Sequence, residues 1–177
     1  MLISMVYVIS QDGTLGHNQN IPWKSNIEFK RYKAVTNNKL VIVGRKSWES
    51  HHFGKDNKDM IVISSLPLPE MTVQWAVSLD EALQMASLQS RDEVVIIGGA
   101  SLFKEAMNYC HVIYKATILM DIPGNVRAPL IPPNRFKLVW VRNIKELPAY
   151  TFQTFVIREL ENNKPTPDFG LITHTAG

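Results

Sequence analysis

One acidic residue lies among aromatic residues near the start of an expected helix. Glu28 follows Trp23 by five residues, and Phe29 and Tyr32 are close to it in sequence. On a helix, Glu28, Tyr32 and Val35 share one face. A carboxyl group on such a face, beside Trp23, is partly removed from water, which raises its pKa. Carboxyl groups in this setting are typical of active sites.

The same glutamate also fits a purely structural role. Ser25 and Glu28 form the Ser-x-x-Glu pattern of a capping box, in which the glutamate reaches back to the start of the helix. Ser78 and Glu81 repeat this pattern at a second expected helix, where nothing indicates a site. The residue types alone therefore leave Glu28 open between a helix cap and an active-site acid.

Two glycine-containing turns follow apolar runs and are candidates for phosphate binding. Gly98-Gly99-Ala100-Ser101 follows residues 94–97, and Gly44-Arg45-Lys46-Ser47 follows residues 40–43. Glycines let the backbone approach a ligand, and the start of a helix offers free N–H groups to an anion. Neither turn has a dinucleotide fingerprint or a P-loop, so each alone also fits an ordinary tight turn. Two such turns at the carboxyl ends of parallel strands favour a ligand site.

Apolar runs rich in Val and Ile alternate with helical patterns along the chain. This alternation predicts an α/β domain with a mostly parallel central sheet and helices on both faces. Only a polar loop separates the last two strands, which predicts an antiparallel C-terminal strand. We expect one domain at residues 1–161 and a tail at 162–177. The expected helices are 25–36, 78–87 and 100–107, and the expected strands are 2–9, 39–43, 60–64, 72–77, 93–97, 112–119, 136–142 and 154–160.

Composition argues against several other classes of protein. The 177 residues, 45% hydrophobic and 20% charged, fit one globular domain. No apolar run predicts a membrane span, and the first residues do not predict a secretory signal. A single cysteine, Cys110, excludes an internal disulfide and favours the cytoplasm, while adjacent His51 and His52 without a third ligand do not predict a metal site. The net charge of +3 comes from scattered Lys and Arg residues, which disfavours nucleic acid as a partner.

Taken together, these motifs resemble the dihydrofolate reductase family over roughly residues 2–160. The order and spacing of the motifs are specific, whereas each motif alone is weak. This order favours the active-site role of Glu28 over the cap. The motifs are Asp12-Gly13-x-x-Gly16, Ile21-Pro22-Trp23, the acid five residues after that tryptophan, Gly44-Arg45-Lys46-Ser47-Trp48-Glu49-Ser50, Ile63-Ser64-Ser65 and Ile96-Ile97-Gly98-Gly99-Ala100.

The resemblance implies a single-domain dihydrofolate-reductase-like fold and NADPH as the cofactor. The implied reaction is reduction of 7,8-dihydrofolate to 5,6,7,8-tetrahydrofolate, by hydride transfer to pterin C6 with protonation at N5. The implied protein is a cytoplasmic monomer with a small-molecule substrate and no metal, nucleic acid or membrane partner.

The resemblance also implies roles for individual residues. Those expected to act in catalysis are Glu28, Trp23 and Ile21. Those expected to bind the substrate are Val6, Tyr7, Val8, Glu28, Phe29, Tyr32, Ser50, Lys58, Ile97 and Tyr114. Those expected to bind NADPH are Val8, Leu15, Gly16, Gly44, Arg45, Lys46, Ser47, Ser64, Ser65, Gly98, Gly99, Ala100, Ser101, Leu102 and Phe103. Among them, Arg45 and Ser65 are the candidates for the 2′-phosphate, and Gly98-Gly99 is expected to have a cis peptide bond.

Four features depart from the family pattern. Lys58 replaces an arginine that pairs with the substrate's α-carboxylate, and residues 53–57 replace a proline-rich turn. Ala116 replaces a threonine that bonds the active-site acid, and Gly124-Asn125 replaces the Gly-Asp pair that latches the catalytic loop. Because a lysine lacks the fork of an arginine, we expect weaker binding of the glutamate tail, seen in KM more than in kcat.

Two other functions remain open from the sequence. One is a reductase of the same fold that acts on another heterocycle, such as a ribosylated pyrimidine in riboflavin synthesis. The other is a binding or structural protein that keeps the fold without turnover. Pro22, Trp23 and Glu28 argue against the first, although the altered pocket for the substrate's tail keeps it open. Retention of the acid, the nicotinamide loop and the phosphate turns together argues against the second.

Overall fold

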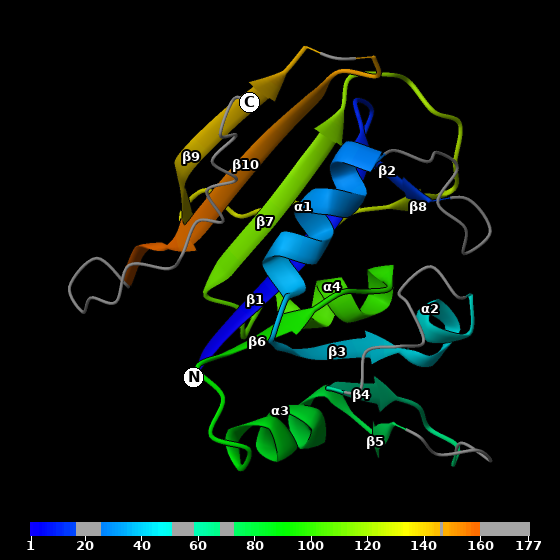
Figure 1. The fold of residues 1–177 in the computed structure, drawn as a ribbon, viewed down its shortest axis with the longest axis vertical. Coiled ribbons are helices and arrows are strands. Elements are labelled where there is room, and N and C mark those ends of the chain that lie inside the picture. The colour runs from blue at the N-terminus through cyan, green and yellow to red at the C-terminus, as the bar shows by residue number, and fades with distance from the viewer. Residues whose placement is uncertain (17–25, 51–58, 68–72, 146, 160–177) are drawn as a thin grey trace, which may run out of the picture.

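The computed structural model describes residues 1–16, 26–50, 59–67, 73–145 and 147–159, and an eight-stranded sheet runs through them (Figure 1). The order of strands across the sheet is β5-β4-β3-β6-β1-β7-β10-β9. The strands are β1 (Leu2–Ser10), β3 (Leu40–Gly44), β4 (Met60–Ile63), β5 (Gln74–Ala76), β6 (Glu93–Ile96), β7 (Val112–Ile118), β9 (Phe136–Ile144) and β10 (Tyr150–Ile157).

Most neighbouring strands of this sheet are parallel. β1 pairs in parallel with β6 and β7, β3 with β4 and β6, and β4 with β5. β10 is antiparallel to both β7 and β9. The parallel strands therefore end at one common edge, so that the turns after β3 and β6 lie next to each other.

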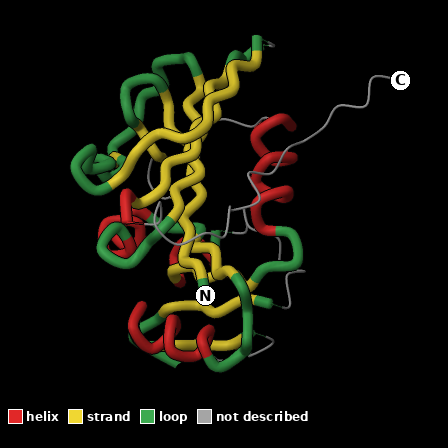
Figure 2. Tube along the Cα trace, turned by 90° about the vertical axis from the view of Figure 1, so that its left-hand side faces the viewer, coloured by secondary structure: helices red, strands yellow, loops and turns green. Residues whose placement is uncertain are grey.

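Helices cover both faces of the sheet because its central strands are apolar on both sides. α1 (Asn26–Thr36) and α3 (Leu79–Ser87) lie on opposite sides of it (Figure 2). Val35 of α1 belongs to one buried cluster, whereas residues of α3 and of α4 (Ala100–Ala106) belong to another. The fold class expected from the sequence is therefore confirmed.

A second, small sheet lies beside the main one and was not expected. It pairs β2 (Thr14–Gly16) with β8 (Val126–Arg127) in antiparallel fashion. Strands of three and two residues are too short to show an alternating pattern, so the sequence gives no signal for them. Gly124 precedes β8 and packs tightly against β2, since a Cβ atom there would lie 2.3 Å from Thr14 Cγ2 and 2.7 Å from the Gly16 carbonyl oxygen.

The expected element boundaries differ from the structure mainly at the last strand. We expected it to begin at Thr154, whereas β10 begins at Tyr150. Its buried residues Tyr150, Phe152 and Thr154 alternate with more exposed ones, which is the pattern of a strand with one face on the core. The expected boundary between domain and tail at residues 161 and 162 falls outside the described residues. Within the described part of the chain, no helix is both long and apolar enough to cross a membrane.

We predict that Gly124→Ala destabilises the protein. The added methyl group would collide with Thr14 and with the backbone of Gly16, so β2 and β8 would have to move apart. Overpacking of this kind costs about 1–3 kcal/mol, measurable by urea unfolding. Leu130→Ala is the control, because Leu130 is 91% exposed and its truncation should change stability by less than about 0.5 kcal/mol. Equal unfolding curves for Gly124→Ala and the wild type would contradict this packing.

Candidate active site

The two glycine-containing turns meet at the carboxyl edge of the sheet. The Gly44 N–H group donates a hydrogen bond to the Gly98 carbonyl oxygen at 2.7 Å. Just before these turns, the Ile97 N–H group donates to Ile42 at 2.9 Å, which continues the parallel pairing of β3 and β6. The two turns therefore lie side by side and are joined by a backbone hydrogen bond.

Close contact between the turns requires glycine at positions 98 and 99. Gly98 has φ +124°, a conformation that other residues rarely adopt. A Cβ atom at Gly99 would lie 2.8 Å from Ser47 Oγ. The peptide bond between Gly98 and Gly99 is cis, as expected from the resemblance. Without side chains here, the backbone forms an open cradle beside α2 (Arg45–Glu49) and the start of α4.

A cavity of about 550 Å³ runs over this cradle. The sequence-predicted site residues that line it come from four strands, three helices and the turns that follow the strands. They are Val6, Tyr7, Val8, Leu15, Gly16, Tyr32, Gly44, Arg45, Lys46, Ser47, Ser50, Ser64, Ser65, Ile97, Gly98, Gly99, Ala100, Ser101, Leu102, Phe103 and Tyr114.

Some candidate residues are not among the lining residues. Ile21, Trp23 and Lys58 fall outside the described residues, and Glu28 lies on α1 with its side chain outside them. Phe29 was expected to line the pocket, but it is 48% exposed, with Lys33 Nζ 4.7 Å from its ring centroid. On α1 the buried positions are Arg31, Val35 and Thr36, and Phe29 points away from that side.

One end of the cavity carries cations and hydroxyl groups. Arg45 and Lys46 line it at the start of α2, and Arg45 Nε also donates to Glu49 Oε1 at 2.6 Å. Ser64 donates its hydroxyl to the Leu66 carbonyl oxygen at 2.7 Å, so this hydroxyl is already used within its own turn. Ser65 is exposed beside it. Two cations next to a glycine cradle fit the phosphates of a dinucleotide.

The other end of the cavity is largely apolar. Val8 of β1 lies in register with Ala116 of β7, and Ala116 lies in register with Phe152 of β10. All three residues line the cavity, together with Tyr32 of α1, whose pKa is raised by burial so that its phenol stays neutral. Thr117, the next residue of β7, is not among the lining residues, because successive side chains of a strand face opposite sides. An apolar surface of this kind fits a flat ring.

Sequence reasoning missed two lining residues at the apolar end. Phe152 falls in the predicted loop, because the predicted last strand begins at Thr154 and β10 begins at Tyr150. Arg31 was not considered, although it lies three residues after Glu28 on the same helix. No local pattern distinguishes Arg31 from its neighbours Lys30 and Lys33, so the sequence offers no signal for it.

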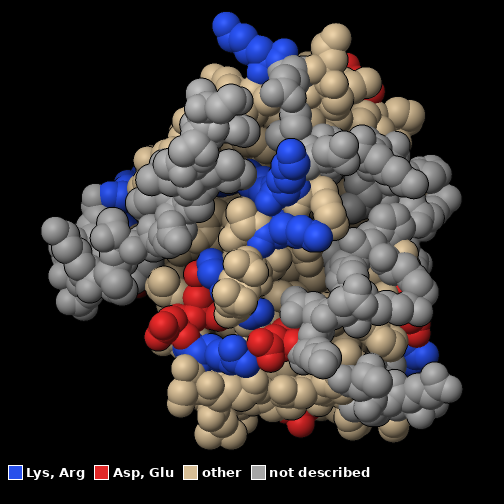
Figure 3. Space-filling view, viewed as in Figure 1, with Lys and Arg blue, Asp and Glu red and all other residues tan. Residues whose placement is uncertain are grey.

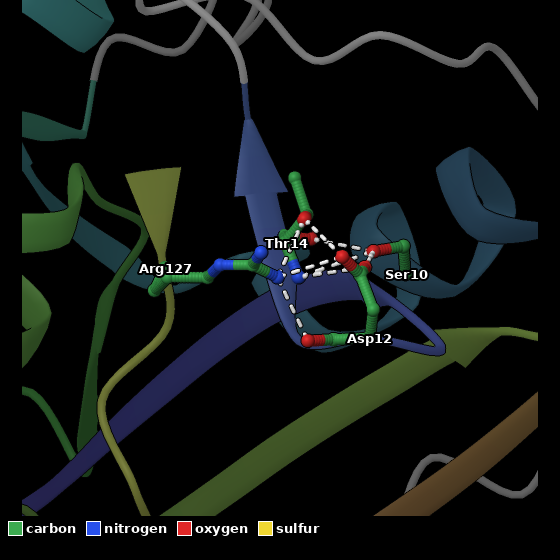
Figure 4. A network of polar contacts seen from close by, with 4 residues as sticks. All are labelled: Ser10, Asp12, Thr14 and Arg127. Atoms are coloured by element: carbon green, nitrogen blue, oxygen red, sulfur yellow. Dashed lines mark hydrogen bonds and ion pairs between the residues drawn. The ribbon is translucent and has the colours of Figure 1, made fainter. Parts of the chain in front are cut away.

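A polar network lies next to the segment that carries the lining residues Leu15 and Gly16 (Figure 4). Asp12 accepts hydrogen bonds from the hydroxyl groups of Ser10 and Thr14, and its Oδ2 atom lies 2.7 Å from Arg127 Nη1. Arg127 also donates to the Asp12 carbonyl oxygen at 2.8 Å. These bonds, led by the one from Ser10, lower the pKa of Asp12 well below its usual range. The carboxylate therefore stays charged in mild acid, and the network ties β8 to the turn before Leu15 and Gly16.

The fold and the cavity together define a class of protein. An open α/β sheet with a cleft at the carboxyl ends of its parallel strands, cationic at one end and apolar at the other, is typical of enzymes that bind a nucleotide cofactor beside a small substrate. Among the described residues, no group of three or more His, Cys, Asp or Glu side chains could hold a metal ion.

Comparisons with known proteins make the class more specific. The family model of dihydrofolate reductase matches residues 2–158. A dihydrofolate reductase of Buchnera aphidicola subsp. Acyrthosiphon pisum is 36% identical over 132 residues, which are 73% of this chain and 80% of that protein. Dihydrofolate reductase type 15 of Escherichia coli is 30% identical over 154 residues, which are 86% of this chain and 97% of that protein.

A solved structure shares the fold. The dihydrofolate reductase from Enterococcus faecalis complexed with NADP(H) and RAB-propyl superposes with a TM-score of 0.81 and 24% identity, covering 89% of this chain and 96% of that one. The chain therefore belongs to the dihydrofolate reductase family, and the resemblance inferred from its motifs is confirmed.

We predict that Arg127→Met raises the KM for the nucleotide cofactor several-fold while changing kcat less. Loss of the bonds to Asp12 and Thr14 frees the segment that carries Leu15 and Gly16, which line the cavity. The measurement is steady-state kinetics with varied NADPH. Arg135→Met is the matched control, since Arg135 also donates to a backbone carbonyl, Asn108 at 2.6 Å, but neither Asn108 nor its chain neighbours line the cavity. Equal changes in the two variants would contradict a specific role for Arg127.

Proposed function

We propose that the protein reduces 7,8-dihydrofolate to 5,6,7,8-tetrahydrofolate with NADPH, by hydride transfer to pterin C6 and protonation at N5. The observation that carries this proposal is the single cleft with two unlike ends. The turns after β3 and β6 form a cationic end lined with glycines, and the residues under α1 form an apolar end. Family membership supplies the reaction that such a cleft serves.

The cofactor end fits NADPH on the chemistry of its own residues. Bound NADPH supplies the hydride, and the protein supplies position and surroundings. The cradle of Gly98 and Gly99 lets backbone groups approach a pyrophosphate, and Arg45 and Lys46 neutralise its charge. Arg45 and Ser65 are the proposed contacts of the 2′-phosphate, because both lie at the open rim of this end.

The substrate end is proposed to bind the pterin ring. Val6, Val8, Tyr32, Ile97 and Tyr114 line it, and their apolar surfaces exclude water from the space where the two rings would meet. Exclusion of water holds reacting groups in fixed positions and strengthens every charge interaction in the cleft.

Glu28 is the proposed anchor of the pterin. Its carboxylate would accept hydrogen bonds from the amino group and a ring nitrogen, which polarises the ring and raises its affinity for a proton. Its place on α1, one turn before Tyr32, supports this role. Water is the proposed direct donor of the proton. Trp23 and Ile21 are proposed to close over the nicotinamide, and Lys58 to attract the α-carboxylate of the substrate.

We also propose that the protein acts as a monomer in the cytoplasm on small molecules alone. Among the described residues of the face drawn in Figure 3, Lys and Arg side chains lie at the centre and adjoin Asp and Glu side chains in the lower part, so they form no continuous basic surface there. Such a surface is a poor match for a nucleic-acid backbone.

We predict that Glu28→Gln folds normally but turns over about a hundred-fold more slowly or worse. Glutamine keeps the shape and can still cap the helix, whereas it loses the charge that holds the pterin. The measurement is dihydrofolate-dependent loss of NADPH absorbance. Absence of dihydrofolate turnover in the wild type would contradict the proposed reaction.

Glu81→Gln is the matched control for a purely structural glutamate. Glu81 is the acid of the Ser-x-x-Glu pattern at α3, where Ser78 Oγ accepts from the Glu81 N–H group and Glu81 Oε2 accepts from the Val77 N–H group. Its replacement should leave turnover unchanged. If Glu28→Gln also kept near-normal turnover, Glu28 would be a cap and no more.

We predict that Arg45→Ala weakens binding of NADPH much more than binding of NADH. A hydrogen bond between charged groups contributes about 1.5–3 kcal/mol, or about ten-fold to a hundred-fold in affinity. The measurement is the dissociation constant of each cofactor. Glu49→Gln is the control, because it removes the ion pair with Arg45 and keeps the cation. Equal losses for the two cofactors would show that Arg45 does not contact the 2′-phosphate.

A further inference from the structure

Arg31 is a buried cation in the wall of the cleft. It lies on the side of α1 that faces the sheet and is only 5% exposed. Its guanidinium carbon lies 4.7 Å from the ring centroid of Trp140 and 4.9 Å from that of Phe152. Both rings belong to the antiparallel strands β9 and β10, so the cation is held between the helix and the sheet.

The guanidinium group of Arg31 does not have hydrogen-bond partners for all of its N–H groups. Its Nη2 atom is buried and has no hydrogen-bond partner, and no ion pair joins Arg31 to any carboxylate among the described residues. Burial lowers the pKa of Arg31 to about 10, while Tyr114 acts to raise the pKa and Arg142 to lower it further. Arg31 therefore remains charged at neutral pH, since arginine gives up its proton only in strong base.

This charge lies at the apolar end of the cleft. Arg31 lines the cavity with Tyr32, Tyr114, Ala116 and Phe152, and it is the charged side chain among the described residues of that end. Among the described residues, the ionisable groups that act on it are Tyr114 from β7 and Arg142 from β9. Ala116 brings no polar atom to this end.

We propose that Arg31 is a specificity-determining residue of the substrate end. Its fixed positive charge favours a neutral ring that carries a hydrogen-bond acceptor and disfavours a ring that binds as a cation. This inference rests on the proposed assignment of the substrate to the apolar end.

The physical reason is that a buried charge is poorly screened. In a site with low dielectric constant and no salt, repulsion between two cations is several times stronger than in water. Because Arg31 keeps its proton, the cost of two neighbouring positive charges falls on the ligand, which binds less tightly in its protonated form. The charge of Arg31 also offsets part of the attraction that a negative Glu28 would exert on a cation.

The experiment compares how each substitution changes the binding of two planar ligands of different charge. The probes are 2,4-diaminopyrimidine, which takes up a proton on its ring, and 7,8-dihydropterin, which is neutral and carries a carbonyl oxygen. Binding to the NADPH-loaded protein is measured by calorimetry in two buffers, so that the protons taken up with each ligand are counted. The variants are Arg31→Met, which keeps the length, and Arg31→Lys, which keeps the charge.

Arg31→Met should bind 2,4-diaminopyrimidine about ten-fold more tightly or better than the wild type does, with more protons taken up per ligand. Binding of 7,8-dihydropterin should weaken or stay the same. Arg31→Lys should behave like the wild type. Lys33→Met is the control, because Lys33 is an exposed cation of the same helix that does not line the cavity.

If Arg31→Met changes the affinity for both ligands by the same factor and leaves proton uptake unchanged, the proposal is overturned. Arg31 would then be a packing residue. If Arg31→Met does not fold, the same comparison is made with Arg31→Gln. If the ratio of the two ligand affinities in Arg31→Gln equals that of the wild type, the proposal is overturned. Turnover of dihydrofolate by the wild type is measured first. Its absence would overturn the proposed function, whereas normal turnover with parallel changes overturns only the role of Arg31.

Discussion

The hydrogen bond from the Gly44 N–H group to the Gly98 carbonyl oxygen, 2.7 Å long, joins the two turns on which the cleft depends. By itself such a bond contributes only about 1 kcal/mol. Its importance lies in geometry, because it fixes the distance between α2 and α4, which follow the two turns. A Cβ atom at position 99 would lie 2.8 Å from Ser47 Oγ, so the Ser47 hydroxyl would have to turn away to make room. Glycine at this position therefore keeps the cation-bearing helix and the glycine cradle close together.

Much of the fold could be predicted because its strongest signals are local. Runs such as residues 40–43 and 94–97 are apolar throughout, as expected for strands buried on both faces. The glycines after them mark turns, and parallel pairing brings these turns to one edge. The elements that the sequence does not predict are short or have a mixed hydrophobic pattern. β2 and β8 have too few residues to show a period, and the start of β10 contains Thr151 and Gln153 between its buried positions.

Arg31 could not be found in this way, because the groups that bury it are distant in sequence. Trp140 and Phe152 lie more than a hundred residues later, and nothing around Lys30, Arg31 and Lys33 distinguishes the buried cation from the exposed ones. A charged residue on a short helix is normally exposed. The tertiary structure overrides that rule here, at a cost that a well-packed apolar side chain would avoid. Such exceptions to local rules concentrate where a protein binds its ligands.

The cleft therefore has a positive charge at both ends, but one charge is exposed to solvent and the other is buried. Arg45 is 36% exposed and paired with Glu49, so salt screens it and its pull on an anionic cofactor weakens as ionic strength rises. Arg31 is buried between two rings, where counterions do not reach it. A single positive charge therefore has two different effects. At the cofactor end Arg45 attracts an anion from solution, and at the substrate end Arg31 is proposed to discriminate between bound rings. Burial, rather than the number of cations, decides which of these effects each arginine has, since the dielectric constant around a charge sets its range.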